Sequence, residues 1–437
     1  MRSSRLLLGA CAPALLVSAA ASAGESRAIT VEEAVALAIG QNAGLQAARA
    51  RLEGGQDVAS STARRLAPAI RLSDQFLHYN AAFVPLIPAG PGQTAPFPVR
   101  KQDTNMFTVT ADQPLLGLLR LSADYESQQR SAEAGAAQVE SAELSLRQAV
   151  ETLYLRVFEA RALEGTALAS ERELNDRLDV ARAQLATGVL TEADVLRVQV
   201  AAANARQQAI QAHSQELVSR AGLLALMGLP ADDTGVTFAE PKSLLESGQK
   251  PPEAAAAQDQ ALSGRPEILQ TRLSLQAGEH QRRARLYALL PEIDLEGAYL
   301  RSYGQVIVPT NSAFIGLKAQ WAIWEWGASY AAYRASRAQA RAAAFDLENQ
   351  KQQIRAEVTS GMAQLDAAAS AISVAEQAIT SAQEAYRVTQ AQLLAGTATT
   401  TDLLEAQSAL TQARLNYLRA QYELAISRVN LRRVLGR

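Results

Sequence analysis

Two stretches of the chain carry the same pattern and decide its fold: LATGVLTEADVLRVQ (Leu185–Gln199) and LLAGTATTTDLLEAQ (Leu393–Gln407). Around them, residues 184–228 align without a gap with residues 392–436, and 15 of the 45 aligned positions are identical. Two unrelated Ala-rich helices would not agree this often, so the chain contains an internal duplication.

The duplication divides the chain into two repeats, residues 24–228 and 262–437, joined by a connector at 229–261. A second alignment, shifted by 223 positions, pairs Pro68 with Pro291 near the start of each repeat. The connector contains four prolines, which is typical of a linker.

Each repeat has the same predicted order of elements: a helix ended by a proline, two strands, a long helix and a shorter return helix. One glycine, Gly188 or Gly396, separates the long helix from the return helix. In the first repeat we expect a helix at about 44–66, strands at about 69–79 and 104–113, a long helix at about 118–186 and a return helix at about 191–228. In the second repeat we expect a helix at about 266–289, strands at about 292–303 and 313–324, a long helix at about 328–394 and then a return helix.

From the rise of an α-helix, each long helix should extend over about 100 Å. In the first repeat, the return helix and the first helix together have nearly the same length as the long helix. Two short helices stacked end to end can therefore lie alongside one long helix.

The predicted strands alternate between apolar and polar residues. Ile315 and Leu317 fall on one face, and Gly316 and Lys318 fall on the other. This pattern is typical of a membrane β-barrel with a wet lumen, and equally of a half-exposed strand in a soluble sheet. Four strands cannot close a barrel, and a strand in lipid cannot leave an open edge. Either the sheet is soluble or several chains share one barrel, and three chains would supply twelve strands.

All three tryptophans, Trp321, Trp324 and Trp326, lie where the last predicted strand passes into the long helix. They fit an aromatic belt at a membrane interface, or packing in the core at the junction.

The first 23 residues have the organisation of a cleaved signal peptide, with Arg2 and Arg5 before an apolar run and small residues at 21–23. The only cysteine, Cys11, lies inside this segment. A lipidated N-terminus is the alternative, but processing at Cys11 would leave the apolar run Leu15–Val17 outside the signal.

Composition argues against several function classes. With 42 Lys and Arg against 44 Asp and Glu, the chain lacks the excess of basic residues that is typical of nucleic-acid-binding proteins. Its three histidines are widely spaced, which argues against a metal site of the usual spacing. No phosphate-binding glycine loop or nucleophile elbow is present. We therefore expect no enzyme activity, no metal and no cofactor.

The duplicated plan and the two quoted turns resemble TolC-like outer-membrane efflux proteins, as do LAPAIRL, LLPEIDL and ADQPLLG at the helix–strand junctions. The resemblance implies an α+β membrane protein that forms a homotrimer. Its twelve-stranded barrel, four strands from each chain, would lie in outer-membrane lipid, and its long coiled-coil tunnel would cross the periplasm. It implies a passive exit channel of a tripartite efflux or type I secretion system, working with a periplasmic adaptor protein and an inner-membrane pump.

The resemblance also implies site residues. The helical turns would form the periplasmic end and dock the adaptor, through Gly188, Leu190, Thr191, Gly396, Thr397 and Thr399. Asp402 and Glu405, three residues apart, would ring the pore constriction, with Asp194 at the sister turn. Relatives close this end through a basic residue where this chain has Ala398, and an aromatic partner where it has Leu393.

Another class stays open: a soluble periplasmic coiled-coil scaffold or adaptor without a pore. It would share the long helices but would have no lipid-facing strands.

Overall fold

The computed structural model describes residues 28–246 and 252–437, so the predicted signal peptide and Cys11 lie outside the described residues. Two long helices dominate it: α3 (Gly117–Ala186) has 70 residues and α8 (Ala328–Leu394) has 67. Neither contains proline. Each therefore runs without a break over about 100 Å. Of the helices in the described residues, none is long and apolar enough to span a membrane.

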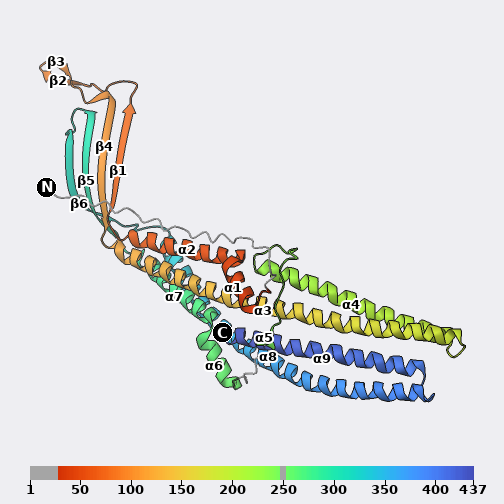
Figure 1. The fold of residues 1–437 in the computed structure, drawn as a ribbon. Coiled ribbons are helices and arrows are strands. Elements are labelled where there is room, and N and C mark those ends of the chain that lie inside the picture. The colour runs from red at the N-terminus through yellow and green to blue at the C-terminus, as the bar shows by residue number, and fades with distance from the viewer. Residues whose placement is uncertain (1–27, 247–251) are drawn as a thin grey trace, which may run out of the picture.

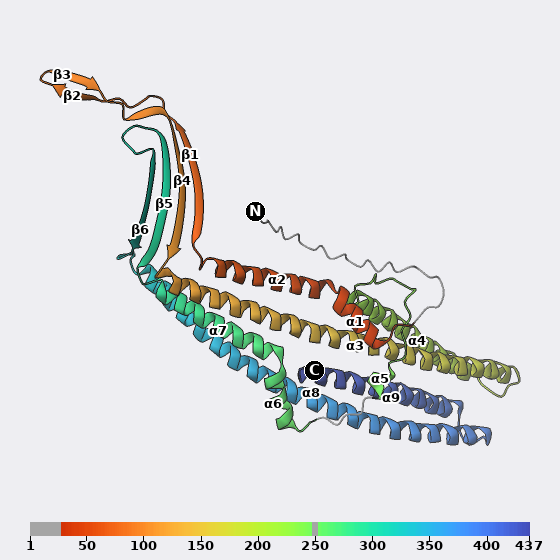
Figure 2. The ribbon, with the colours of Figure 1, turned by 60° about the vertical axis from the view of Figure 1, so that its left-hand side comes forward.

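Each long helix is flanked by two shorter helices that follow one another along its length (Figures 1 and 2). Helices α2 (Ala43–Arg64) and α4 (Glu192–Leu226) pack on α3. Helices α7 (Pro266–Tyr287) and α9 (Thr400–Val434) pack on α8. The arrangement of stacked short helices beside continuous long ones is the one expected from the helix lengths.

A four-stranded antiparallel sheet lies at one end of the helices (Figure 1). Its order is β1-β4-β5-β6, with bounds Ala69–His78, Arg100–Pro114, Glu292–Gln305 and Asn311–Gln320. The central pair β4–β5 joins the two repeats. Within the described residues, β1 and β6 are edge strands with no further strand beside them.

The strand register separates an apolar face from a polar face. Residues paired across the sheet share a face, and these pairings place Ile70 and Ile315 in one row and Leu72 in the next. On this face Ile70 is 76% exposed, Leu72 68% and Ile315 77%, so none of the described residues covers it. The opposite face carries the ion pair Arg71–Asp112, with Nη1 and Oδ2 2.5 Å apart.

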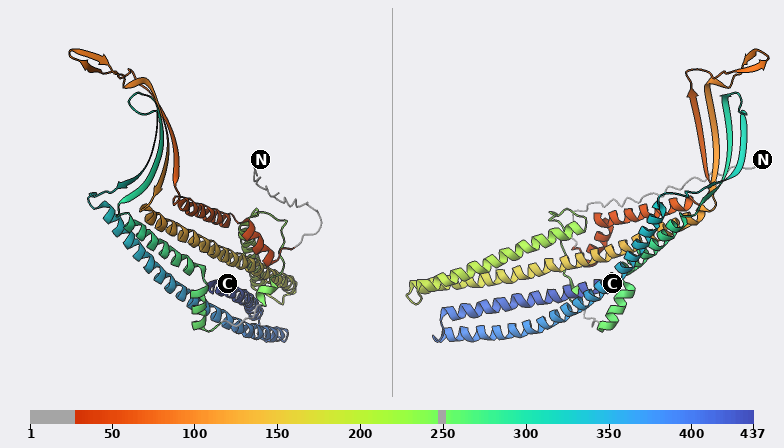
Figure 3. Two further views of the ribbon diagram at one scale, coloured as in Figure 1. Left: turned by 90° about the vertical axis from the view of Figure 1, so that its left-hand side faces the viewer. Right: turned by 180° about the vertical axis from the view of Figure 1, so that it is seen from behind.

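Several elements differ from the expected ones. The proline-rich segment 80–103 contains a β-hairpin, β2 (Leu86–Gly90) and β3 (Gln93–Pro96), which projects beyond the other strands (Figure 3). Proline is tolerated there because the hairpin consists only of edge strands. Strand β6 ends at Gln320, before the tryptophans.

Short helices were also missed. Helix α1 (Val31–Gln41) precedes α2, and the connector contains α5 (Lys242–Leu245) and most of α6 (Ala254–Gly264). Helix α6 is rich in alanine, a strong helix former. It packs on α8, and its Ala257 and Ala261 are fully buried.

Polar contacts join the short helices where they meet end to end. In the first repeat, Asn42 caps α2 through Leu45 N, 3.1 Å away, and its Nδ2 donates to the carbonyl of Leu226 at the end of α4, also 3.1 Å away. Tyr154 of α3 lies at the same level and donates to the carbonyls of Ile29 and Ala239, at 2.8 and 2.5 Å. This joint is therefore tied to the N-terminal segment and the connector.

In the second repeat, the joint is a partly buried ion cluster. Arg433 in the last turn of α9 binds Glu267 in the first turn of α7, where each charge also suits the helix dipole. Arg265, only 5% exposed, binds Glu267 and reaches Glu357 of α8. Ser141 of α3 donates to Glu267 Oε1 at 2.8 Å. Glu267 thus links α7 to α9 and α3, and Arg265 extends the cluster to α8 through Glu357.

Glu267→Gln should therefore destabilise the helical region. Burial acts to raise the pKa of Glu267, but hydrogen bonds from Arg265 and Ser141, together with the charge of Arg265, outweigh burial and lower the pKa to about 2. We expect a loss on the order of 2–3 kcal/mol at neutral pH. Because the folded-state pKa lies below the unfolded value of 4.5, this contribution is complete at neutral pH and disappears as the pH falls through the folded-state value. Thermal melts followed by circular dichroism should show the two proteins converging in acid.

A matched control is Glu384→Gln, since the Glu384–Arg387 pair on α8 is exposed to solvent and exposed pairs contribute little. This change should leave the melting temperature nearly unchanged. An equal loss in both variants would contradict the assigned role of Glu267.

Candidate functional site: the paired helical turns

The two long helices end in the same turn. We call the segments 187–191 and 395–399 the first and second tips; both lie at the end of the helices farthest from the sheet (Figure 2). In the first tip, Val189 N donates to the Gln184 carbonyl and Gly188 N donates to the Leu185 carbonyl. The second tip repeats both bonds, from Thr397 to Gln392 and from Gly396 to Leu393. This is the Schellman motif, which satisfies the last carbonyls of a helix.

The motif requires a left-handed residue, and glycine supplies it. Gly188 has φ 78° and Gly396 has φ 77°. A Cβ atom would meet nothing within 4 Å at either position. A side chain there would be opposed by the backbone conformation alone, not by a clash.

Each return helix then begins with a capping box. Thr399 N donates to Asp402 Oδ2 at 2.7 Å, and Asp402 N donates back to Thr399 Oγ1 at 3.2 Å. Thr191 and Asp194 form the same pair of bonds at 3.1 and 3.3 Å. Both aspartates of the predicted constriction therefore cap helices. The T-x-x-D spacing could have revealed this in the sequence.

Capping fixes the charge of these carboxylates. The backbone and side-chain hydrogen bonds from Thr399 hold the pKa of Asp402 below its ordinary value. Hydrogen bonds from Thr191, and beyond them Arg197, lower the pKa of Asp194 in the same way. Glu405 lies one turn further along α9 and is exposed. Glu405 forms no ion pair with any of the described residues, so it is the freer carboxylate.

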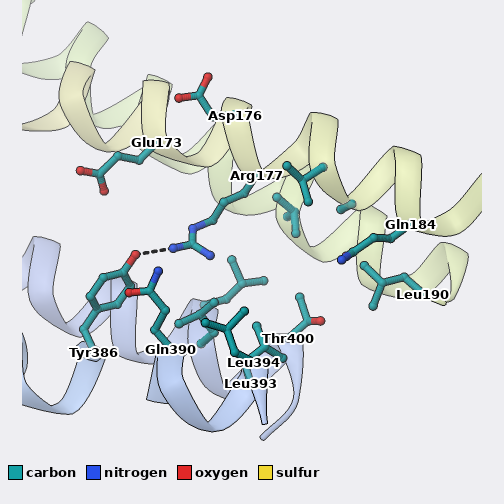
Figure 4. A pocket seen from close by; sticks show the side chains of 15 residues that line it. Glu173, Asp176, Arg177, Gln184, Leu190, Tyr386, Gln390, Leu393, Leu394 and Thr400 are labelled. Carbon is teal, nitrogen blue, oxygen red and sulfur yellow. Dashed lines mark hydrogen bonds between the residues drawn. The ribbon is translucent and has the colours of Figure 1, made fainter. Parts of the chain in front are cut away.

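Polar contacts connect the hairpin α3–α4 with the hairpin α8–α9 near the tips. Arg197 bonds Asp194 Oδ1 and, from the same Nη1, donates to Thr401 Oγ1 of the other hairpin, both at 3.1 Å. Arg177 donates to the hydroxyl of Tyr386 (Figure 4). Sequence reasoning missed Arg177, Arg197 and Tyr386.

Ala398 is half-buried, while Leu393 and Leu190 line a cleft between the hairpins.

The three tryptophans lie outside any strand and are exposed. Trp321 is 59% exposed, Trp324 75% and Trp326 88%, so they do not form a core within this chain. Trp321 Nε1 donates to the Leu289 carbonyl at 3.3 Å, and the rings of Trp324 and Trp326 meet edge to face. Trp326 is also in the left-handed region, at φ 53°.

The sequence matches a known family over most of its length. Residues 34–229 and 257–437 match the family described as outer membrane efflux protein. The chain belongs to this family. The predicted family and the outer-membrane localisation are therefore confirmed.

Individual relatives agree with the family. The chain is 26% identical over 299 residues to the outer membrane efflux protein BepC of Brucella suis biovar 1 (strain 1330). The match covers 67% of this chain and 63% of BepC, so the chain spans less than two thirds of the length of this curated relative.

Solved structures of similar fold extend over nearly the whole chain. The outer membrane protein VceC from Vibrio cholerae aligns with a TM-score of 0.79 at 17% identity, covering 93% of this chain and 96% of VceC. The open state of the MtrE outer membrane channel from Neisseria gonorrhoeae aligns with a TM-score of 0.77 at 18% identity, covering 93% and 88%. The predicted α+β fold of this efflux family is thus confirmed.

The capping boxes predict a local effect at the tips. Thr399→Val removes the hydroxyl that accepts from Asp402 N. Backbone amides in the first turn of α9 should then exchange about fivefold faster. Because the pKa of Asp402 lies below its ordinary value of 3.8, protection in the native protein should persist in mild acid and fall only below that value. Hydrogen exchange followed by mass spectrometry measures both effects.

Thr389→Val is the matched control. Its hydroxyl donates to the Ala385 carbonyl within α8 and caps nothing. Exchange in α9 should stay at the native rate in this variant. If Thr399→Val also leaves that rate unchanged, the capping box does not hold the tip.

Proposed function

We propose that the chain is one protomer of a trimeric exit channel in the outer membrane. It conducts substrates passively after an inner-membrane pump and a periplasmic adaptor protein deliver them. The observation that carries the proposal is the sheet, with one exposed apolar face, one polar face and two unpaired edges among the described residues. Lipid does not tolerate open sheet edges, so the sheet needs further copies to close it. Three copies would supply twelve strands, enough for a barrel with a wet lumen.

The same sheet argues against a soluble scaffold. Ile70, Leu72 and Ile315 lie together on one face and are each more than two thirds exposed. A contiguous aliphatic surface of this kind is unfavourable in water and suited to lipid. The exposed Trp321, Trp324 and Trp326 would then lie at the membrane interface where the strands meet the helices.

The helices would form the periplasmic tunnel. At most levels four helices of each chain run side by side, so three chains would place twelve around the axis. The tips would dock the adaptor through the turns around Gly188 and Gly396. We assign Glu405 and Asp402 to the constriction, with Asp194 at the sister turn. The proposal includes no catalytic step and no cofactor.

The assignment of Asp402 and Glu405 to the constriction can be tested by measuring ion selectivity. Asp402→Asn/Glu405→Gln removes two charges per chain, and asparagine keeps an oxygen acceptor for the cap. In planar bilayers the native trimer should conduct with a preference for cations, because a ring of carboxylates attracts them. The double variant should conduct with a cation-to-anion permeability ratio near one, measured as the reversal potential in a salt gradient.

The control is Glu53→Gln/Asp57→Asn, which removes the same charges from exposed positions on α2, close to the sheet. It should keep the native reversal potential. An unchanged potential in the tip variant would mean that Asp402 and Glu405 face away from the pore. A protein that neither conducts nor cross-links as a trimer in detergent would refute the channel itself.

Docking at the tips predicts a separable defect. Gly396→Val places a β-branched residue in the left-handed region that Gly396 occupies. The strain costs about 1–2 kcal/mol and should distort the tip. Export by the assembled system should fall severalfold while trimer yield, measured by cross-linking, is retained. Gly54→Val on α2, also with open space around Cβ, should affect export little. Normal export by a correctly inserted Gly396→Val protein would contradict the docking role.

A further inference from the structure

A cleft of about 440 Å³ lies between the two hairpins just above the tips. Its walls come from all four helices of the hairpins, α3, α4, α8 and α9, and from the first tip. Its apolar wall includes Val180, Leu190, Leu393, Leu394, Leu403 and Leu404. Leu394 is 86% exposed, so nothing among the described residues covers this part of the wall. A concave aliphatic site of this volume is of the size that small organic ligands occupy.

One cationic side chain projects into the cleft. Figure 4 shows Arg177 of α3 reaching across toward α8, where it meets Tyr386, with the amide of Gln390 beside them. Arg177 is half-buried and donates to the Tyr386 hydroxyl. That bond uses one of the five N–H donors of a guanidinium. A polar end with donors therefore adjoins an apolar wall.

The nearby carboxylates do not fill this polar end. Glu173 and Asp176 line the rim and are exposed, and Asp176 points away from Arg177 and Tyr386 (Figure 4). Charges in solvent are screened by water and salt, whereas the half-buried guanidinium is screened less. At the polar end itself, the guanidinium of Arg177 and the amide of Gln390 present hydrogen-bond donors, which suit an anionic group on the ligand.

We propose that this cleft binds a small amphipathic organic anion. Its carboxylate pairs with Arg177, whose planar fork matches two carboxylate oxygens, and its apolar body lies along the leucines. The proposed binding does not depend on the proposed channel function. Because its walls come from both hairpins, a bound ligand contacts both and holds them at a fixed distance.

The test uses phenylbutyrate as the probe and the full chain, assembled and held in an amphipol. Ligand-observed saturation-transfer NMR should detect binding of phenylbutyrate, with phenylbutylamine and phenylbutanol bound about tenfold more weakly. Arg177→Gln should weaken phenylbutyrate about tenfold and abolish the preference for the anion. Arg182→Gln, an exposed arginine on the same helix outside the cleft, should leave binding unchanged.

A second variant keeps the test decisive if Arg177→Gln does not fold. Leu404→Ala trims the apolar wall and leaves the charge, so it should weaken all three probes by a similar factor. Equal binding of the amine and the acid, or equal losses in Arg177→Gln and Arg182→Gln, would overturn the proposal. So would the absence of binding in the assembled protein, which would mean that a second copy of the chain covers the cleft.

Discussion

The antiparallel pairing of β4 with β5 is the constraint on which the rest of the structure depends. Pro114 at the end of β4 lies opposite Asp294 near the start of β5, and Ala69 of β1 and Gln320 of β6 lie at the same end of the strands. The four helices that adjoin the sheet, α2, α3, α7 and α8, therefore attach at one end of the strands and extend away from the sheet on the same side. This is why the two hairpins of a duplicated chain reach the same level at their far ends, and why their tips can act together.

Much of this architecture could be predicted from the sequence, because the residues that end its helices are easily recognised. Proline ends the first helix of each repeat, and a single glycine divides each proline-free stretch, so α3 and α8 lie close to their expected bounds. The missed elements had weak or contrary local signals. The β2–β3 hairpin contains prolines, which disfavour a strand, and α6 depends on its packing against α8.

The candidate site was harder to predict, because its geometry comes from contacts between distant residues. Arg177 and Tyr386 are 209 positions apart, and no local pattern marks either of them. Arg197 meets Thr401 only because the hairpins pack side by side. The glycines and aspartates of the tips were visible as motifs. Both Asp194 and Asp402 lie three residues after a threonine, and this spacing marks them as capping residues in the two repeats.

The end-to-end joints have a mechanical consequence. Halfway along the helices, α3 and α8 are continuous, whereas the neighbour of each consists of two helices that meet end to end. A bending load crosses this level through the two continuous helices and through the contacts between the interrupted ones. The polar contacts of Asn42 and of Glu267 join the interrupted helices across these gaps. Side chains at this level thus set how far a force applied at one end of the chain bends the other.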